Sequence, residues 1–91
     1  MDIRKVFGLN MRRMRLAAGL SQEAVAASMD VDRAHVSSME RGQQNVTLLT
    51  LWQAAEALGC RAADFLDERG ASAVTPASLK KKAPRRRRTK L

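Results

Sequence analysis

The sequence predicts an all-α fold of five short helices followed by a basic tail. Three observations support this prediction. Apolar residues recur every three to four positions, no run alternates apolar and polar residues as a strand would, and a residue suited to helix capping precedes most of the apolar segments. With 91 residues, the chain can form one domain with a modest core, but not a deep catalytic cleft.

The first two helices are expected at residues 2 to 18 and 22 to 29. Asp2 and Ser21 are suitable N-caps for them, because their side-chain oxygens can accept from the free N–H groups of a first turn. Apolar spacing predicts an inward face for the first helix made of Phe7, Met11, Met14 and Ala18, and for the second of Val25 and Met29.

Three further helices are expected after the short segment "MDV". The third runs to residue 41, with Asp32 as its cap and with Val36 and Met39 inward. Thr47 caps the fourth, and "AADFL" offers a short fifth. The predicted inward face of the fourth helix consists of Leu48, Leu51, Ala55 and Leu58.

The net charge of +8 at pH 7 is concentrated at the C-terminal end of the sequence. Residues 1 to 79 contain nine cations and nine acids, whereas residues 80 to 91 contain eight cations and no acid: Lys80, Lys81, Lys82, Arg85, Arg86, Arg87, Arg88 and Lys90. The turn-prone stretch "GASAVTPASL" precedes them. We therefore expect a domain at residues 1–69 and a disordered basic tail at residues 70–91, able to bind DNA phosphates without sequence preference.

Several classes of protein are not expected from this composition. A single cysteine, Cys60, cannot form an internal disulfide and fits a reducing compartment. We expect a cytoplasmic protein, since no apolar run approaches the length of a membrane span and no signal peptide is recognisable. Metal-spaced ligands and arrangements of catalytic residues are absent from the sequence, so we expect neither cofactor, metal nor enzymatic activity.

The second and third helices are separated by a turn short enough to force a steep crossing, which is typical of a helix-turn-helix. The segment "MRRMRLAAGLSQEAVAASMDVDRAHVSSMERG" resembles the Cro/cI-type (XRE) helix-turn-helix family, and "NVTLLTLWQAAEALG" is similar to that family's fourth helix. The resemblance covers residues 7 to 66, places the motif at residues 21–42, and implies a lambda-repressor-like DNA-binding domain. Asp30 replaces the glycine that the family prefers, and we expect it to adopt a left-handed conformation.

The resemblance implies that the third helix lies in the major groove of double-stranded DNA. Carried over to this chain, the base-reading residues are Arg33, Ala34 and Ser38; an arginine can donate twice to guanine, and an alanine can pack on the methyl group of thymine. The expected contacts to phosphate or groove are Gln22, His35, Ser37, Arg41, Gln44 and Asn45. The alternative is that these residues are merely solvated polar side chains.

Two further pairs are expected to serve other purposes. The resemblance pairs Arg15 with Glu40 as a partly buried structural ion pair between the first and third helices. Leu49 and Trp52 fall on the outward side of the fourth helix, three positions apart. Either Trp52 folds back over the edge of the core, or the two side chains form a contact between the subunits of a homodimer.

These observations predict a sequence-specific DNA-binding transcriptional regulator, expected to be a dimeric repressor that occupies a pseudo-palindromic operator. One alternative is an antitoxin, which would bind and neutralise a toxin as its protein partner while regulating its own operon. Another makes the basic tail primary, as in a nonspecific nucleic-acid compactor.

Overall fold

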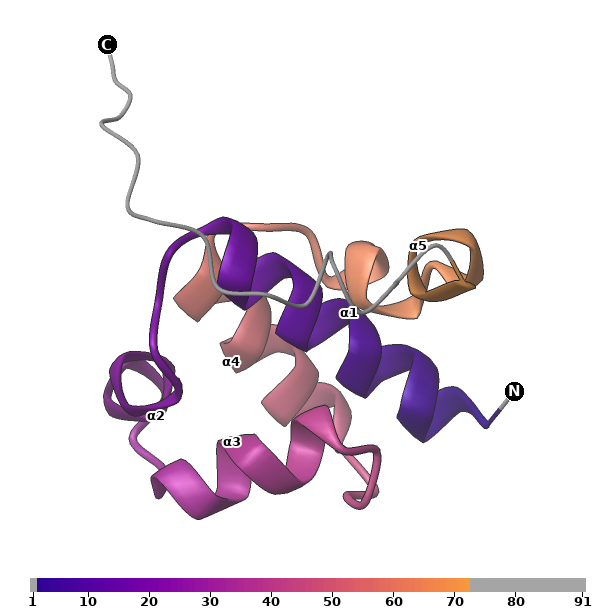
Figure 1. The fold of residues 1–91 in the computed structure, drawn as a ribbon. Helices are drawn as coiled ribbons and strands as arrows, with labels where there is room; N and C mark the ends of the chain where they lie inside the picture. Colours follow the sequence, from indigo (N-terminus) through magenta and orange to yellow (C-terminus); the bar gives the residue numbers. More distant parts are fainter. Residues whose placement is uncertain (1, 73–91) are drawn as a thin grey trace, which may run out of the picture.

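The computed structural model describes residues 2–72, and within them it contains helices and no strand. The predicted all-α fold is confirmed. The elements are α1 (Ile3–Ala17), α2 (Gln22–Met29), α3 (Arg33–Glu40), α4 (Leu48–Leu58), the 3₁₀ helix η1 (Ala62–Leu66) and α5 (Glu68–Ser72). In Figure 1, α1 crosses the middle of the molecule, with α2 and α3 on one side of it and α5 on the other. The basic residues 80–90 lie outside the described residues.

The helix starts agree with the sequence predictions except in one detail. The side chains of Asp2, Ser21 and Thr47 each accept from a backbone N–H of the helix that follows. Asp32 occupies the N-cap position of α3, but its side chain makes no capping hydrogen bond, which corrects the expected role of that carboxylate. Asp30 adopts the expected left-handed conformation, with φ at 57°.

The C-terminal boundary of the domain differs from the sequence prediction. The expected boundary after residue 69 lies inside α5, which continues to Ser72. Ala71 is only 2% exposed, and the side chain of Asn10 reaches from α1 to donate to the carbonyls of Phe65 and Asp67, each at 2.9 Å. The hydrogen bonds hold the chain just before α5, and the burial of Ala71 shows that packing extends into a segment whose composition had suggested disorder.

The core lies between α1, the helix-turn-helix pair and α4, and Phe7 stacks on Phe65 with ring centroids 5.1 Å apart. Two predicted inward positions are wrong: Leu48 is 83% exposed and Ala18 is also exposed. Each has the right angular position on its helix but lies at a helix end, beyond the reach of the core. Ala54, which the predicted stripe omitted, is fully buried.

The position of α3 depends on a close approach of α1 to its C-terminal end. A Cβ atom at Gly8 would lie 2.5 Å from the carbonyl oxygen of Met39 and 2.6 Å from that of Glu40. Any larger residue would therefore force the two helices apart. The glycine costs α1 about 1 kcal/mol in helix propensity relative to alanine, and it brings α3 against α1.

Candidate nucleic-acid interface

Helix α3 has one buried side and one open side. Val36 and Met39 are fully buried against the core, whereas Arg33 and Ala34 are exposed. In Figure 1, α3 lies at the edge of the molecule, next to α2. The helix therefore presents its N-terminal half outward from a fixed base, which is the arrangement that contact with a groove requires.

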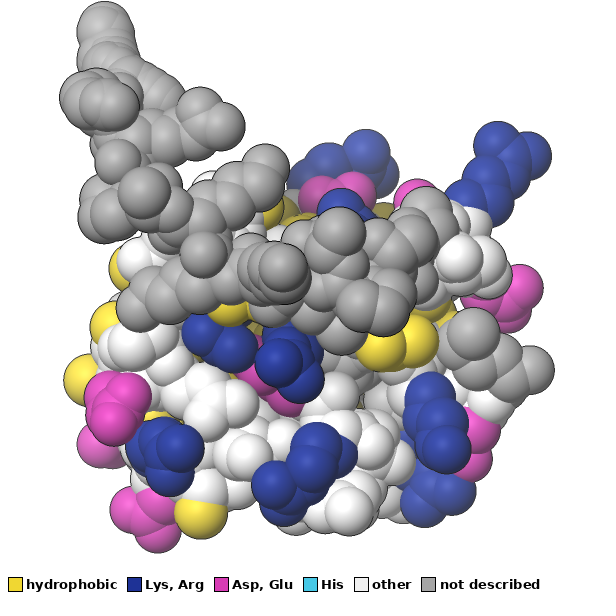
Figure 2. Space-filling view, viewed as in Figure 1, with side chains coloured by type: hydrophobic (Ala, Val, Ile, Leu, Met, Phe, Trp, Pro, Cys, Tyr) yellow, Lys and Arg dark blue, Asp and Glu magenta, His cyan; other side chains and the backbone are white. Residues whose placement is uncertain are grey.

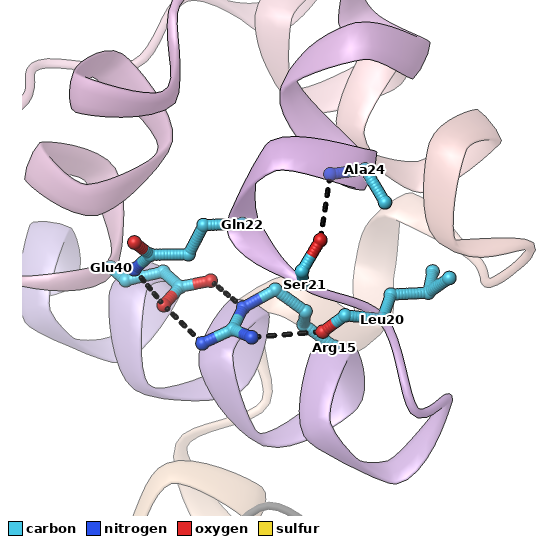
Figure 3. A network of polar contacts seen from close by, with 6 residues as sticks. All are labelled: Arg15, Leu20, Ser21, Gln22, Ala24 and Glu40. Carbon is cyan, nitrogen blue, oxygen red and sulfur yellow. Dashed lines mark hydrogen bonds and ion pairs between the residues drawn. The ribbon is translucent and has the colours of Figure 1, made fainter. Parts of the chain in front are cut away.

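Arg15 and Glu40 form a buried ion pair between α1 and the last residue of α3. Arg15 Nε donates to Glu40 Oε2 at 2.6 Å and Nη2 donates to Oε1 at 3.1 Å, with the two side chains 8% and 2% exposed. The third guanidinium nitrogen, Nη1, donates to the carbonyl of Leu20 at 2.9 Å. The pair thus joins α1, the turn after it and α3 (Figure 3).

Gln22, the first residue of α2, extends this network toward the surface. Its Nε2 donates to Glu40 Oε1 at 3.1 Å, as Figure 3 shows, and the side chain is half-buried. The expected phosphate contact is therefore not a freely rotating amide, because one of its two N–H groups is already bound to a buried carboxylate.

Arg33 lies beside an acidic residue that the sequence analysis did not single out. Its Nε is 3.7 Å from Glu23 Oε2, and both side chains are largely exposed, at 60% and 72%. Because exposed pairs of this kind contribute little free energy, the guanidinium remains able to reach a base. The two residues lie in the first turns of separate helices, so no spacing along one helix could have revealed the pair.

The two serines of α3 are already hydrogen-bonded. Ser38 Oγ accepts from Gln44 Nε2 at 2.9 Å, and Ser37 Oγ accepts from Arg41 Nη1 at 2.9 Å. The structure thus brings the expected base-reading residue Ser38 together with Gln44, and it pairs two of the expected contacts to phosphate or groove, Ser37 and Arg41. Each hydroxyl keeps a hydrogen that can be donated. Asn45 is exposed in the loop after α3.

A shallow polar hollow opens where α2 begins, and α1 contributes to it. Arg12 is a lining residue that the sequence analysis missed. Its position on the exposed side of α1 gave no signal, since the hollow forms only when α1, α2 and α3 meet. The polar lining residues are Arg12, Arg15, Ser21, Gln22, Glu23 and Arg33.

The charge of the described surface is mixed. Figure 2 shows Lys and Arg side chains scattered over this face of the molecule, with uncharged surface between them and with acidic side chains both at the edges and near the centre. A domain of this kind does not attract DNA through net charge. Its binding depends on individual side chains and on their positions.

The second exposed feature is apolar and lies on α4. Leu48, Leu49 and Trp52 are 83%, 65% and 59% exposed. Trp52 therefore does not fold back over the edge of the core, which was one of the two alternatives. We call these three residues the α4 apolar patch.

No helix among residues 2–72 has the length and apolarity needed to cross a membrane. No three of the His, Cys, Asp and Glu side chains in these residues are grouped as a metal site. The thiol of Cys60 packs against the core, and burial raises its pKa, which favours the neutral form.

Comparison with known proteins agrees with this geometry. The family model described as helix-turn-helix matches residues 11–65. An HTH-type transcriptional regulator of Sinorhizobium fredii is 46% identical over 59 residues, covering 65% of this chain and 77% of its own length. Control protein C.BamHI of Bacillus amyloliquefaciens is 39% identical over 67 residues, covering 72% and 83% respectively.

A solved structure with a similar fold is the restriction-modification controller protein C.AhdI from Aeromonas hydrophila. It superposes with a TM-score of 0.66 at 39% identity and covers 68% of this chain and 94% of that protein. The relatives are named as regulators and controllers, and none supports the antitoxin alternative or an enzymatic activity. The chain therefore belongs to the Cro/cI-type helix-turn-helix family of DNA-binding transcriptional regulators.

Proposed function

We propose that the chain represses transcription as a homodimer that binds a specific, pseudo-palindromic operator through α3. The observation that carries this proposal is the contrast within α3 itself. Val36 and Met39 are fully buried, while Arg33 and Ala34, one turn earlier, are exposed. A helix fixed in this way can enter a major groove without a change in the fold.

The exposed side chains have the chemistry of base recognition. Arg33 can donate two hydrogen bonds to O6 and N7 of guanine, and Ala34 can pack on the methyl group of thymine. Ser38, one turn after Ala34, can donate its remaining hydrogen to a base acceptor. The proposed contacts to phosphate or groove are Gln22, His35, Ser37, Arg41, Gln44 and Asn45.

The α4 apolar patch supports the proposed dimer. Three large apolar side chains lie within five residues of one helix, and most of the surface of each is exposed to solvent. Pairing with the same patch of a second copy would bury them around a two-fold axis. Two reading helices about 34 Å apart would then fit half-sites one helical turn apart.

The relatives support a role in controlling a promoter. C.BamHI is named a control protein, and C.AhdI a restriction-modification controller protein. We infer that this chain acts on transcription in a similar manner, and that an operator overlapping a promoter would exclude other proteins from the same DNA.

Selection of bound duplexes from a random pool tests the proposal. The full chain should select two inverted half-sites whose centres lie about 10 base pairs apart, with guanine at one position of each half-site. A pool that stays random would contradict sequence-specific binding. A selected site with only one half would contradict the dimer but not the reading helix.

A further inference from the structure

The Gln22 amide is held by the same carboxylate that anchors α3. Glu40 Oε1 accepts from Arg15 Nη2 and from Gln22 Nε2, both at 3.1 Å, while Glu40 Oε2 accepts from Arg15 Nε at 2.6 Å. The ion pair is already bidentate without Gln22. The contact that Gln22 adds joins the buried carboxylate of Glu40 to a half-buried amide at the start of α2 (Figure 3).

This contact fixes which end of the amide lies inward. A carboxylate only accepts hydrogen bonds, so Glu40 selects the orientation in which the Gln22 nitrogen faces it. The nitrogen carries a second hydrogen, which has no partner among residues 2–72. A phosphate also only accepts, so the same nitrogen can bridge the buried carboxylate and a DNA phosphate through its two hydrogens.

We propose that Glu40 is a positioning residue for DNA binding, which acts through Gln22 by holding its amide nitrogen where it can donate to a phosphate. This inference rests on the proposed binding of DNA by α2 and α3. It gives the buried ion pair a second role: the contacts that fix α3 against α1 also orient a phosphate donor on α2.

Glu40→Gln tests the orientation with little change of shape. Both oxygens of Glu40 accept from Arg15, so the NH₂ of the new amide must face one of these donors. We expect the oxygen to keep the shorter contact, with Arg15 Nε at 2.6 Å, which leaves the NH₂ in the position of Oε1, where it faces Gln22. Two NH₂ groups cannot bond to each other, and the Gln22 amide would have to rotate its nitrogen away. The affinity for operator should fall roughly tenfold, as expected for one hydrogen bond to a charged group.

A double-mutant cycle separates this effect from a general loosening of α3. The operator affinities of the full chain, Gln22→Ala, Glu40→Gln and the double variant are measured where circular dichroism shows each to be folded. We expect Glu40→Gln to cause no further loss in the Gln22→Ala background. Equal losses in both backgrounds would overturn the proposal, and so would a gain of affinity on Glu40→Gln.

Glu56→Gln is the matched control, because it removes the same charge from an exposed position on α4. It should leave the affinity unchanged or raise it slightly. If Glu40→Gln fails to fold, NMR relaxation of the side-chain amides in the unmodified protein tests the proposal instead. The Gln22 amide should be rigid, unlike that of Gln53 on α4, and equal mobility of the two amides would overturn the proposal.

The two proposals fail in different ways. A chain that binds no DNA sequence preferentially would contradict the proposed function, whereas the relaxation measurement on the free protein would still show whether Glu40 holds Gln22. A chain that binds its operator but shows independent effects of the two substitutions would contradict only this inference.

Discussion

Helices α3 and α4 are both anchored in the core, but their outward sides differ in chemistry. Helix α3 ends in a buried ion pair and exposes an arginine and an alanine in its first turn. The buried residues of helix α4 are Leu51, Ala54 and Ala55, all apolar, and the helix exposes the α4 apolar patch. The exposed Arg33 of α3 can form directional hydrogen bonds, whereas the side chains of the α4 apolar patch can only be buried.

The difference follows from what each surface would contact. Reading bases requires donors held at fixed positions, and a buried, multiply hydrogen-bonded pair supplies that fixity at a cost in desolvation. A contact between proteins gains free energy mainly from apolar area, so an apolar anchor suffices. The polar network beneath α3 and the apolar patch on α4 therefore suit the two separate interfaces that we propose.

The largest expected effect comes from breaking the anchor of α3. Glu40→Ala and Arg15→Met should each destabilise the domain by about 3–5 kcal/mol, since each leaves one buried charge without its partner. Replacing both residues by apolar ones should recover part of that loss. Chemical denaturation of the two single variants and the double variant measures these changes in the free energy of unfolding. Additive losses would contradict the coupling of these two side chains.

Disrupting the α4 apolar patch should affect assembly and not folding. Trp52→Glu puts a charge into the proposed contact, so the variant should sediment as a monomer and bind the operator about 100-fold more weakly, because two linked half-sites bind far better than one. Gln53→Glu adds the same charge to α4 outside the patch and should change neither property. A folded Trp52→Glu variant that stays dimeric would place the interface elsewhere.

The basic residues near the C-terminus should have the smallest effect on the choice of sequence. Each phosphate neutralised on duplex DNA contributes about 0.9 to the slope of log affinity against log salt. If half of the eight cations engage, deletion of residues 80–91 should reduce that slope by roughly 3–4 per chain. The ranking of operator variants should not change. An unchanged salt slope would mean that these cations do not contact DNA.

Local sequence signals predicted the starts of most helices. Ser21 and Thr47 precede α2 and α4 and cap them with their side chains. Such signals involve residues within one turn of each other, so they can be read without knowledge of the fold. The family resemblance added the pairing of Arg15 with Glu40, which the structure contains.

Features that depend on contacts between helices were not predictable in this way. Leu48 has the periodicity of a core residue but lies beyond the core. The chain just before α5 is bound by Asn10, which donates to the carbonyls of Phe65 and Asp67 from 55 and 57 residues away. The pair of Arg33 with Glu23 and the contact of Gln22 with Glu40 likewise form only when separate helices meet. Periodicity gives the angular position of a residue, not its depth or its neighbour.

We propose that the exposed face of α3 reads bases, and a substitution of Arg33 gives the sharpest test of this role. Arg33→Ala should weaken binding to the best operator by about 1–3 kcal/mol per half-site contact. It should also abolish discrimination at one base pair of each half-site and leave the other positions unchanged. Arg69→Ala is the matched control, since it removes the same charge from an exposed position on α5.

The measurement is a cycle of protein and DNA variants: the unmodified chain, Arg33→Ala and Arg69→Ala, each titrated with the operator, with operators changed at single base pairs, and with scrambled DNA. We expect the loss on Arg33→Ala to vanish for the operator that lacks the guanine contacted by Arg33. An equal loss on operator and scrambled DNA would show that Arg33 contacts only phosphate, and would contradict the assignment of α3 as the reading helix.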